Sequence, residues 1–114
     1  MAEASAELNA RVAEWLGWKA HGGFIEMRRR DGTWKWVKPH QLYDFSGDNA
    51  EAVRWVWPKL VKLKQRPAII DRGTDGIAVR LWPNKRRTPW ETAGMIGDNA
   101  LALALCLAAL EVTK

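Results

Sequence analysis

The sequence predicts an α+β domain in which an antiparallel sheet of about four strands, built from two hairpins, is flanked by three helices. Two pairs of short apolar segments are each joined by a glycine-containing turn, as hairpin strands are. Three longer segments have helical spacing of their apolar residues. The 114 residues are enough for one domain and too few for two, so we expect residues 1–114 to form a single three-layer sandwich in the order α-β-β-α-β-β-α.

The first helix is expected over residues 5–16. One apolar stripe runs along it at intervals of three and four residues: Leu8, Val12, Trp15 and Leu16. Gly17 suits the left-handed position that ends a helix, and Trp18 can then pack back on the last turn.

The first hairpin is expected over residues 24–30 and 33–37, with a two-residue turn at Asp31-Gly32. This turn places Arg29 opposite Trp34. The resulting register separates four apolar side chains from four charged ones: Ile25, Met27, Trp34 and Trp36 against Glu26, Arg28, Arg30 and Lys35.

The second helix is expected to begin at Asp48, with Glu51 completing a capping box. Pro58 falls inside it and predicts a kink or break near residues 54–58. Trp55 lies among basic residues on the face opposite the predicted inner one. The inner face should comprise Val53, Val56, Trp57, Leu60 and Leu63.

The second hairpin is expected over residues 67–72 and 77–82, joined by residues 73–76. Its second strand should bury Ile77, Val79 and Leu81 on one face, and Trp82 should also be a core residue. A basic loop follows, over residues 83–90.

The last helix should begin at Asp98, which suits the N-cap position. The run from Ala100 to Leu110 is apolar on every side, so most of its sides must be covered. One sheet face cannot cover them all. We therefore expect either a central helix flanked by other helices or a contact in a homo-oligomer.

Three blocks of sequence resemble the phage ABA-sandwich domain (BC1872-like), a family of small phage and prophage proteins. They are residues 8–18 (LNARVAEWLGW), residues 43–50 (YDFSGDNA) and residues 98–110 (DNALALALCLAAL). The resemblance implies helices on both sides of an antiparallel sheet and a phage origin. It implies no particular biochemistry, and fold-level analogy cannot supply one.

Enzyme and metal signatures are absent from the sequence. The single cysteine, Cys106, and the two histidines, His21 and His40, do not have zinc-ligand spacing, and no nucleophile elbow or phosphate-binding loop occurs. Asp44 and Ser46 suit a turn before a helix better than a catalytic role. We therefore predict a protein without catalytic residues, metal or cofactor, with Cys106 an inert core thiol.

The expected location is the host cytoplasm. A lone cysteine cannot form an internal disulfide, and the first residues have neither the basic nor the apolar region of a signal peptide. The longest apolar run is too short to span a membrane, so we expect no membrane association.

Basic residues next to tryptophan give the predicted ligand site. The net charge of +5 favours anionic partners. Arginine binds phosphate through two parallel hydrogen bonds, and an indole can stack on a base. We place the site on the basic loop and on tryptophans that could join it: Lys85, Arg86, Arg87 and Trp90, with Trp34, Trp36 and Trp55. For Trp34 and Trp36 a core position is the favoured interpretation.

Three functions compete on this evidence. The first is a non-enzymatic phage protein that binds a small anionic, nucleotide-like ligand and acts as an anti-defence sponge for a host signal. The second is a nucleic-acid-binding accessory protein, which the basic clusters favour. The third is a protein–protein inhibitor of a host factor that uses Trp55 and the basic helix face.

Overall fold

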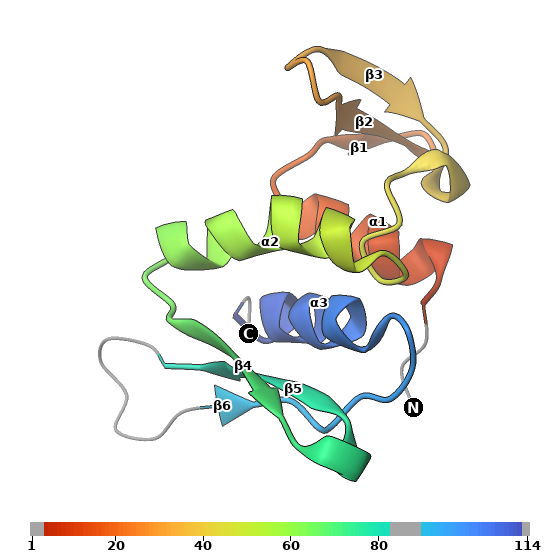
Figure 1. Ribbon diagram of the computed structural model, residues 1–114. Coiled ribbons are helices and arrows are strands. Elements are labelled where there is room, and N and C mark those ends of the chain that lie inside the picture. Colours follow the sequence, from red (N-terminus) through yellow and green to blue (C-terminus); the bar gives the residue numbers. More distant parts are fainter. Residues whose placement is uncertain (1–3, 83–89, 113–114) are drawn as a thin grey trace.

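The computed structural model describes residues 4–82 and 90–112 as a stack of helices between two small sheets (Figure 1). The α+β class and the three helices are confirmed. In chain order the elements are α1 (Ala6–Trp15), β1 (Ala20–His21), β2 (Phe24–Arg28), β3 (Trp34–Val37), the 3-10 turn η1 (Pro39–Gln41), α2 (Asn49–Lys62), β4 (Pro67–Asp71), the 3-10 turn η2 (Gly73–Asp75), β5 (Ile77–Leu81), β6 (Trp90–Glu91) and α3 (Ala100–Val112).

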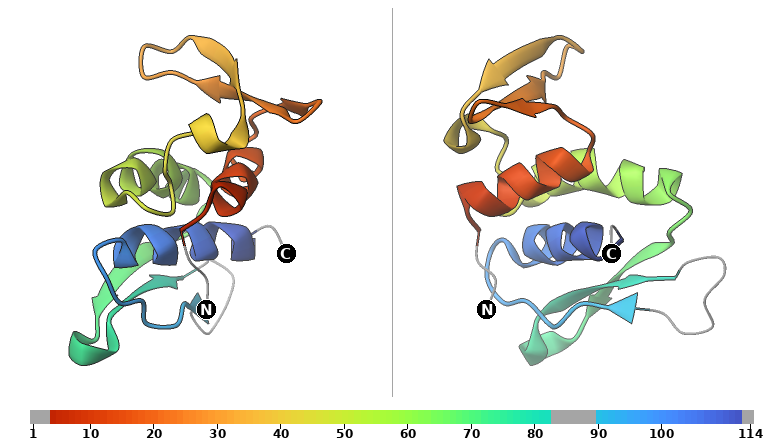
Figure 2. Two further views of the ribbon diagram at one scale, coloured as in Figure 1. Left: turned by 90° about the vertical axis from the view of Figure 1, so that its right-hand side faces the viewer. Right: turned by 180° about the vertical axis from the view of Figure 1, so that it is seen from behind.

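The two hairpins belong to separate sheets and do not share one. Each hairpin gains a short third strand, giving the antiparallel orders β1-β2-β3 and β4-β5-β6. The views in Figures 1 and 2 place α1, α2 and α3 between the two sheets. The physical reason is α3. A helix that is apolar all round occupies the centre of the fold and keeps the hairpins apart.

Helix α3 is the central helix, as its sequence predicts. It packs against α1 and α2 on one side and against β5 on the other. Eight of its residues are buried: Ala100, Ala102, Leu103, Ala104, Leu105, Cys106, Ala108 and Ala109. The small alanine side chains let neighbouring elements approach on several sides, so one chain can cover a helix that no single sheet face could.

The ends of α1 agree with the sequence. Ser5 caps the helix by accepting a hydrogen bond from the Leu8 amide at 3.1 Å. At the other end Gly17 has a φ of +89°, and the Trp18 amide donates to the Ala13 carbonyl at 3.0 Å. This is the expected left-handed helix stop, and it buries the Trp18 side chain.

The predicted register of the first hairpin is wrong by one residue. Arg28 lies opposite Trp34 and Glu26 opposite Trp36, because the loop has three residues where two were expected. The Gly32 amide donates to the Arg29 carbonyl at 3.0 Å, and Gly32 has a φ of +92°. A turn followed by a left-handed glycine is the usual three-residue hairpin loop.

This shift reverses the predicted environment of two tryptophans. Ile25 and Val37 form the buried face of the sheet. Trp34 and Trp36 lie on the other face and each is 47% exposed, so the predicted core position of both is wrong. A change of one residue in loop length exchanges the two faces of a strand.

Helix α2 is continuous through Pro58, so the predicted break is absent. Pro58 leaves the Arg54 carbonyl without its helical donor, but both residues are exposed and water can reach that carbonyl. The inner face is also rotated from the predicted one: Val53 and Leu63 are exposed, whereas Glu51, Ala52, Val56 and Leu60 are buried. The rotation arises because α2 packs against α3 and also carries Trp55 into an aromatic cluster.

The second hairpin largely follows the prediction. Val79 and Leu81 are buried and Ile77 is partly buried. Trp82, which was expected in the core, is 43% exposed, because strand β5 ends at Leu81 and Trp82 lies beyond it.

A polar segment before α2 ties the three helices together. The Asn9 side chain of α1 donates to the Asp44 carboxylate at 3.1 Å and accepts from the Ser46 amide at 2.9 Å. The Asn99 side chain, just before α3, donates to the Ser46 carbonyl at 3.1 Å. Asp44 and Ser46 therefore have structural partners, as expected of turn residues.

The predicted N-cap of α3 is replaced by a residue from another helix. The helix begins at Ala100, so Asp98 lies two residues before it. Asn49, the first residue of α2, accepts a hydrogen bond from the Ala102 amide at 2.9 Å and donates to the Asp98 carbonyl at 2.8 Å. A cap supplied across two helices cannot be found from local sequence.

Replacing Asn49 with alanine should therefore destabilise the fold by about 1–2 kcal/mol, since it removes a cap acceptor and a second hydrogen bond. Urea unfolding of N49A and D98A against the parent chain measures this. We expect a smaller loss for D98A, which removes only a negative charge near the helix end. A loss at Asp98 equal to or greater than that at Asn49 would show that Asp98 is the cap.

Candidate anion-binding cleft

An arginine-lined cleft of about 430 Å³ lies between the β2–β3 loop and α2. We call it the arginine cleft. Its lining residues come from two regions about 25 positions apart in the sequence: Arg28, Arg29, Arg30 and Gly32 from the hairpin, and Arg54 and Trp55 from the helix. Guanidinium groups gathered around an indole are suited to binding an anion that carries an aromatic ring.

The end of β2 and the hairpin loop supply the three consecutive arginines that line this cleft. Asp31 fixes the loop by accepting hydrogen bonds from the Thr33 hydroxyl at 2.6 Å and the Thr33 amide at 2.9 Å. These two bonds, with the hydroxyl bond the larger influence, lower the pKa of Asp31 below its ordinary value. The loop is thus held in shape by a carboxylate that remains ionised at neutral pH.

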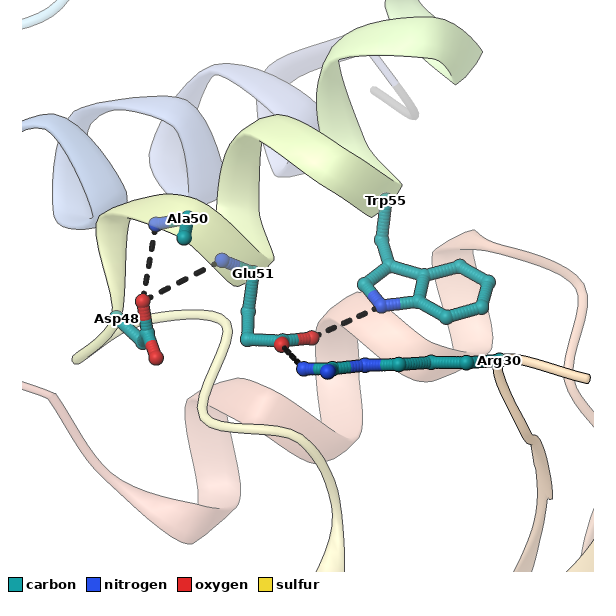
Figure 3. Close-up of polar contacts among 5 residues, drawn as sticks. All are labelled: Arg30, Asp48, Ala50, Glu51 and Trp55. Carbon is teal, nitrogen blue, oxygen red and sulfur yellow. Dashed lines mark hydrogen bonds and ion pairs between the residues drawn. The ribbon is translucent and has the colours of Figure 1, made fainter.

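A buried carboxylate joins the two sides of the cleft, as Figure 3 shows. Glu51 is 6% exposed; one of its oxygens is ion-paired with Arg30 and the other accepts from the Trp55 indole N–H at 3.0 Å. The predicted capping box is therefore not formed: Glu51 bonds to these side chains. Asp48 alone caps α2, accepting from the amides of Ala50 at 2.9 Å and Glu51 at 3.4 Å.

Aromatic rings form the support beneath Trp55. Tyr43 stacks on Trp55 with ring centroids 5.3 Å apart, and Trp18 meets Trp55 edge-on at 5.4 Å. Arg30 also lies over the Tyr43 ring, 6.0 Å from its centroid. This packing holds Trp55 in one position and explains why a tryptophan occurs on the basic face of α2.

The positive charge of the cleft is only partly neutralised. Glu51 pairs with Arg30, but Arg28, Arg29 and Arg54 have no ion pair within residues 4–82 and 90–112. Residues 19–38 carry six basic and two acidic side chains, a net charge of +4. The rest of the chain has twelve basic and eleven acidic residues, so nearly all of the +5 net charge resides on residues 19–38, which comprise the β1-β2-β3 sheet and its flanks.

The predicted site residues do not form one pocket. Trp55 lines the arginine cleft, and Trp34 lies beside it, with the Arg28 guanidinium 6.0 Å from the Trp34 ring centroid. Trp36 lies further along β3. Trp90 is in β6, in the sheet at the opposite end of the molecule (Figure 1), so it cannot share a pocket with Trp34 or Trp36.

The other predicted residues, Lys85, Arg86 and Arg87, lie outside the described residues. Conversely, the sequence did not single out Arg29 and Arg54 as binding residues. The available signals were three arginines at a hairpin turn and an arginine next to Trp55, but such charges more often form a solvated surface.

Cys106 is fully buried in α3, as predicted. Its thiol donates to the Phe45 carbonyl at 3.2 Å. Burial, and secondarily the negative charge of Asp44, raises the pKa of the Cys106 thiol to about 12. The reactive thiolate is therefore very scarce at neutral pH.

Comparison of the chain with protein-family models, curated proteins and solved structures gives no match. Within the described residues there is no cluster of three or more side chains suited to a metal ion, and no helix long and apolar enough to cross a membrane.

We expect Cys106 to resist alkylation by iodoacetamide in the folded protein between about pH 7 and pH 9 and to react fully in denaturant, since its raised pKa keeps it protonated over this range. Mass spectrometry after timed labelling measures the modified fraction. Rapid labelling of the folded chain, at the rate seen in denaturant, would contradict the buried position.

Proposed function

We propose that this protein is a non-enzymatic binding module for a small anionic, nucleotide-like ligand, with the arginine cleft as its site. The observation that carries the proposal is the set of three arginines that have no ion pair among the described residues, Arg28, Arg29 and Arg54, beside Trp55 in a cleft of about 430 Å³. The resemblance to the phage ABA-sandwich family leads us to extend the proposal to a phage accessory protein that sequesters a nucleotide signal of host defence.

The chemistry of the lining residues favours phosphate. Each guanidinium can donate two parallel hydrogen bonds to one phosphate group, and arginines from both sides of the cleft can bind the same ligand. The Trp55 indole N–H already donates to Glu51, so Trp55 has only its ring to offer. A ligand with a phosphate and a flat ring matches both features.

The side chains that line the arginine cleft are suited to binding a ligand and not to catalysing a reaction on it. A guanidinium offers hydrogen-bond donors and positive charge but no acceptor, so the four arginines can hold an anion but supply no nucleophile. Two carboxylates beside the cleft are already engaged: Glu51 is held by Arg30 and Trp55, and Asp31 accepts hydrogen bonds from Thr33. We therefore propose that the cleft retains its ligand unchanged.

Neutralising one arginine on either side of the cleft should weaken binding. For R29Q and R54Q we expect about a 10-fold or greater loss of affinity for pyrophosphate and ADP, because each loses a charged hydrogen-bond donor worth about 1.5–3 kcal/mol. Titration calorimetry at about 50 mM salt, where screening is modest, measures the dissociation constants.

The matched control is R66Q, which removes the same charge from an exposed residue outside the cleft. Its affinity should stay within about 2-fold of the parent, since a distant charge is largely screened. Equal losses in all three variants would reduce the effect to net charge, and an absence of binding to the parent chain would refute the proposal.

Removing the charge of Glu51 should strengthen anion binding while weakening the fold. E51Q frees Arg30 to turn toward a phosphate, so we expect a several-fold gain in pyrophosphate affinity. It should also lower the free energy of unfolding by about 1–2 kcal/mol, since a buried charged hydrogen bond is lost. Calorimetry and thermal unfolding measure the two effects; a folded E51Q chain with unchanged or weaker affinity would contradict this role of Glu51.

A further inference from the structure

The outer face of the β1-β2-β3 sheet carries exposed aromatic rings. Phe24 is 42% exposed, and Trp34 and Trp36 are each 47% exposed. Strand pairing puts them on one face: Trp34 is opposite Arg28, Trp36 is opposite Glu26, and Phe24 is opposite His21. Phe24, Glu26 and Arg28 alternate along β2 and therefore point the same way.

Within the described fold one ring of this face has a partner: Trp34 meets the buried Trp18 edge-on, with ring centroids 6.3 Å apart, yet stays 47% exposed. The opposite face of the same sheet already buries Ile25 and Val37. In Figures 1 and 2 the sheet forms one end of the molecule, and no other described element lies beyond it. A single exposed ring needs no explanation, but three neighbouring rings on one face indicate a binding surface.

The spacing of the rings matches a nucleic acid strand. Trp34 and Trp36 are alternate residues of β3, so their side chains are about 7 Å apart along the strand. Stacked nucleotides rise about 3.4 Å each along one strand, so this distance spans about two of them. Next to Trp36, an apolar hollow of about 260 Å³ is lined by His21, Phe24 and Trp36 and gives room for a further flat ring.

Arg28 connects this face to the arginine cleft. Its guanidinium lines the cleft and also lies 6.0 Å from the centroid of the Trp34 ring. A strand whose bases stack on the tryptophans can therefore bring its phosphates to Arg28 and then into the cleft. The net charge of +4 on residues 19–38 would attract such a backbone.

We propose that the outer face of the β1-β2-β3 sheet is a base-stacking platform for single-stranded nucleic acid, whose phosphates occupy the arginine cleft. The phosphate contacts rest on the proposed function of the arginine cleft. The platform adds the class of ligand, which is an oligonucleotide of several bases. Stacking on aromatic side chains tolerates any base, so binding is expected with little sequence preference. Duplex bases are already paired and stacked and cannot lie on the rings.

The test compares two ligands that differ only in their bases. The full chain is titrated, at about 50 mM salt, with a fluorescently labelled oligothymidylate of about eight nucleotides and with an abasic strand of equal length and phosphate number. Fluorescence anisotropy gives the affinities, and quenching of tryptophan emission reports stacking. We expect the thymidylate to bind at least about 10-fold more tightly than the abasic strand and to quench the emission.

Single substitutions test which aromatic rings cause the difference in affinity between the thymidylate and the abasic strand. W34L and W36L should each lose about 5-fold or more in thymidylate affinity while keeping the affinity of the parent for the abasic strand. The matched control is W82L, since Trp82 is similarly exposed, at 43%, but follows β5 in the other sheet. All three residues are surface-exposed, and circular dichroism verifies that the variants fold.

The outcomes separate this proposal from the previous one. Equal affinity for the thymidylate and abasic strands, or unchanged affinity in W34L and W36L, overturns the platform but leaves anion binding in the cleft intact. Equal affinity for a duplex also overturns it. Thymidylate binding that persists in R29Q and R54Q but is lost in W34L and W36L keeps the platform and overturns the cleft as the phosphate site. No binding of either strand or of pyrophosphate overturns both.

Discussion

The fold depends on a small hydrogen-bonded junction formed by residues 44–49. In space, the first turns of all three helices meet at this junction. Asn9 of α1 holds Asp44 and Ser46, and Asn49 of α2 caps the first turn of α3. Gly47 leaves room there for the Asp44 carboxylate, which a side chain at this position would displace. Asn9 and Ser46 are buried, and their hydrogen bonds join α1 to this segment, while Asn49 and Asn99 join the segment to α3, so the junction couples the packing of the three helices. Residues 8–18, 43–50 and 98–110 all contribute hydrogen bonds to this junction.

The central position of α3 determines what the rest of the molecule exposes. By separating the hairpins, α3 leaves the β1-β2-β3 sheet with only one face toward the helices. The strands of that sheet give Ile25 and Val37 to the buried core, with Met27 packed against it, and the other face carries the exposed tryptophans. The exposed aromatic face and the arginine cleft beside it are thus consequences of how one apolar helix is covered.

At the candidate site, the arrangement of the cleft depends on the buried carboxylate of Glu51. A buried carboxylate needs hydrogen bonds from charged or polar groups, and Glu51 obtains them from Arg30 on the hairpin and Trp55 on its own helix. These contacts fix the hairpin loop against α2 and give the cleft its two sides. The ion pair with Glu51 also neutralises Arg30, one of the four arginines of the cleft. Glu51 therefore fixes the shape of the cleft but reduces its positive charge.

Sequence periodicity and capping signals determined the α+β class, the first helix with its Gly17 stop, the Asp48 cap, the second hairpin and the central role of α3, because these depend on residues close in the chain. Only the tertiary structure decided the hairpin register, the division into two sheets, the cap from Asn49 and the meeting of Arg29 with Arg54. Loop length differs by one residue between equally plausible turns, and contacts across about 25 or 50 positions leave no local pattern. Trp55 was identifiable as unusual from its basic surroundings, but Glu51 and Tyr43, which hold it in place, emerged only from the packing.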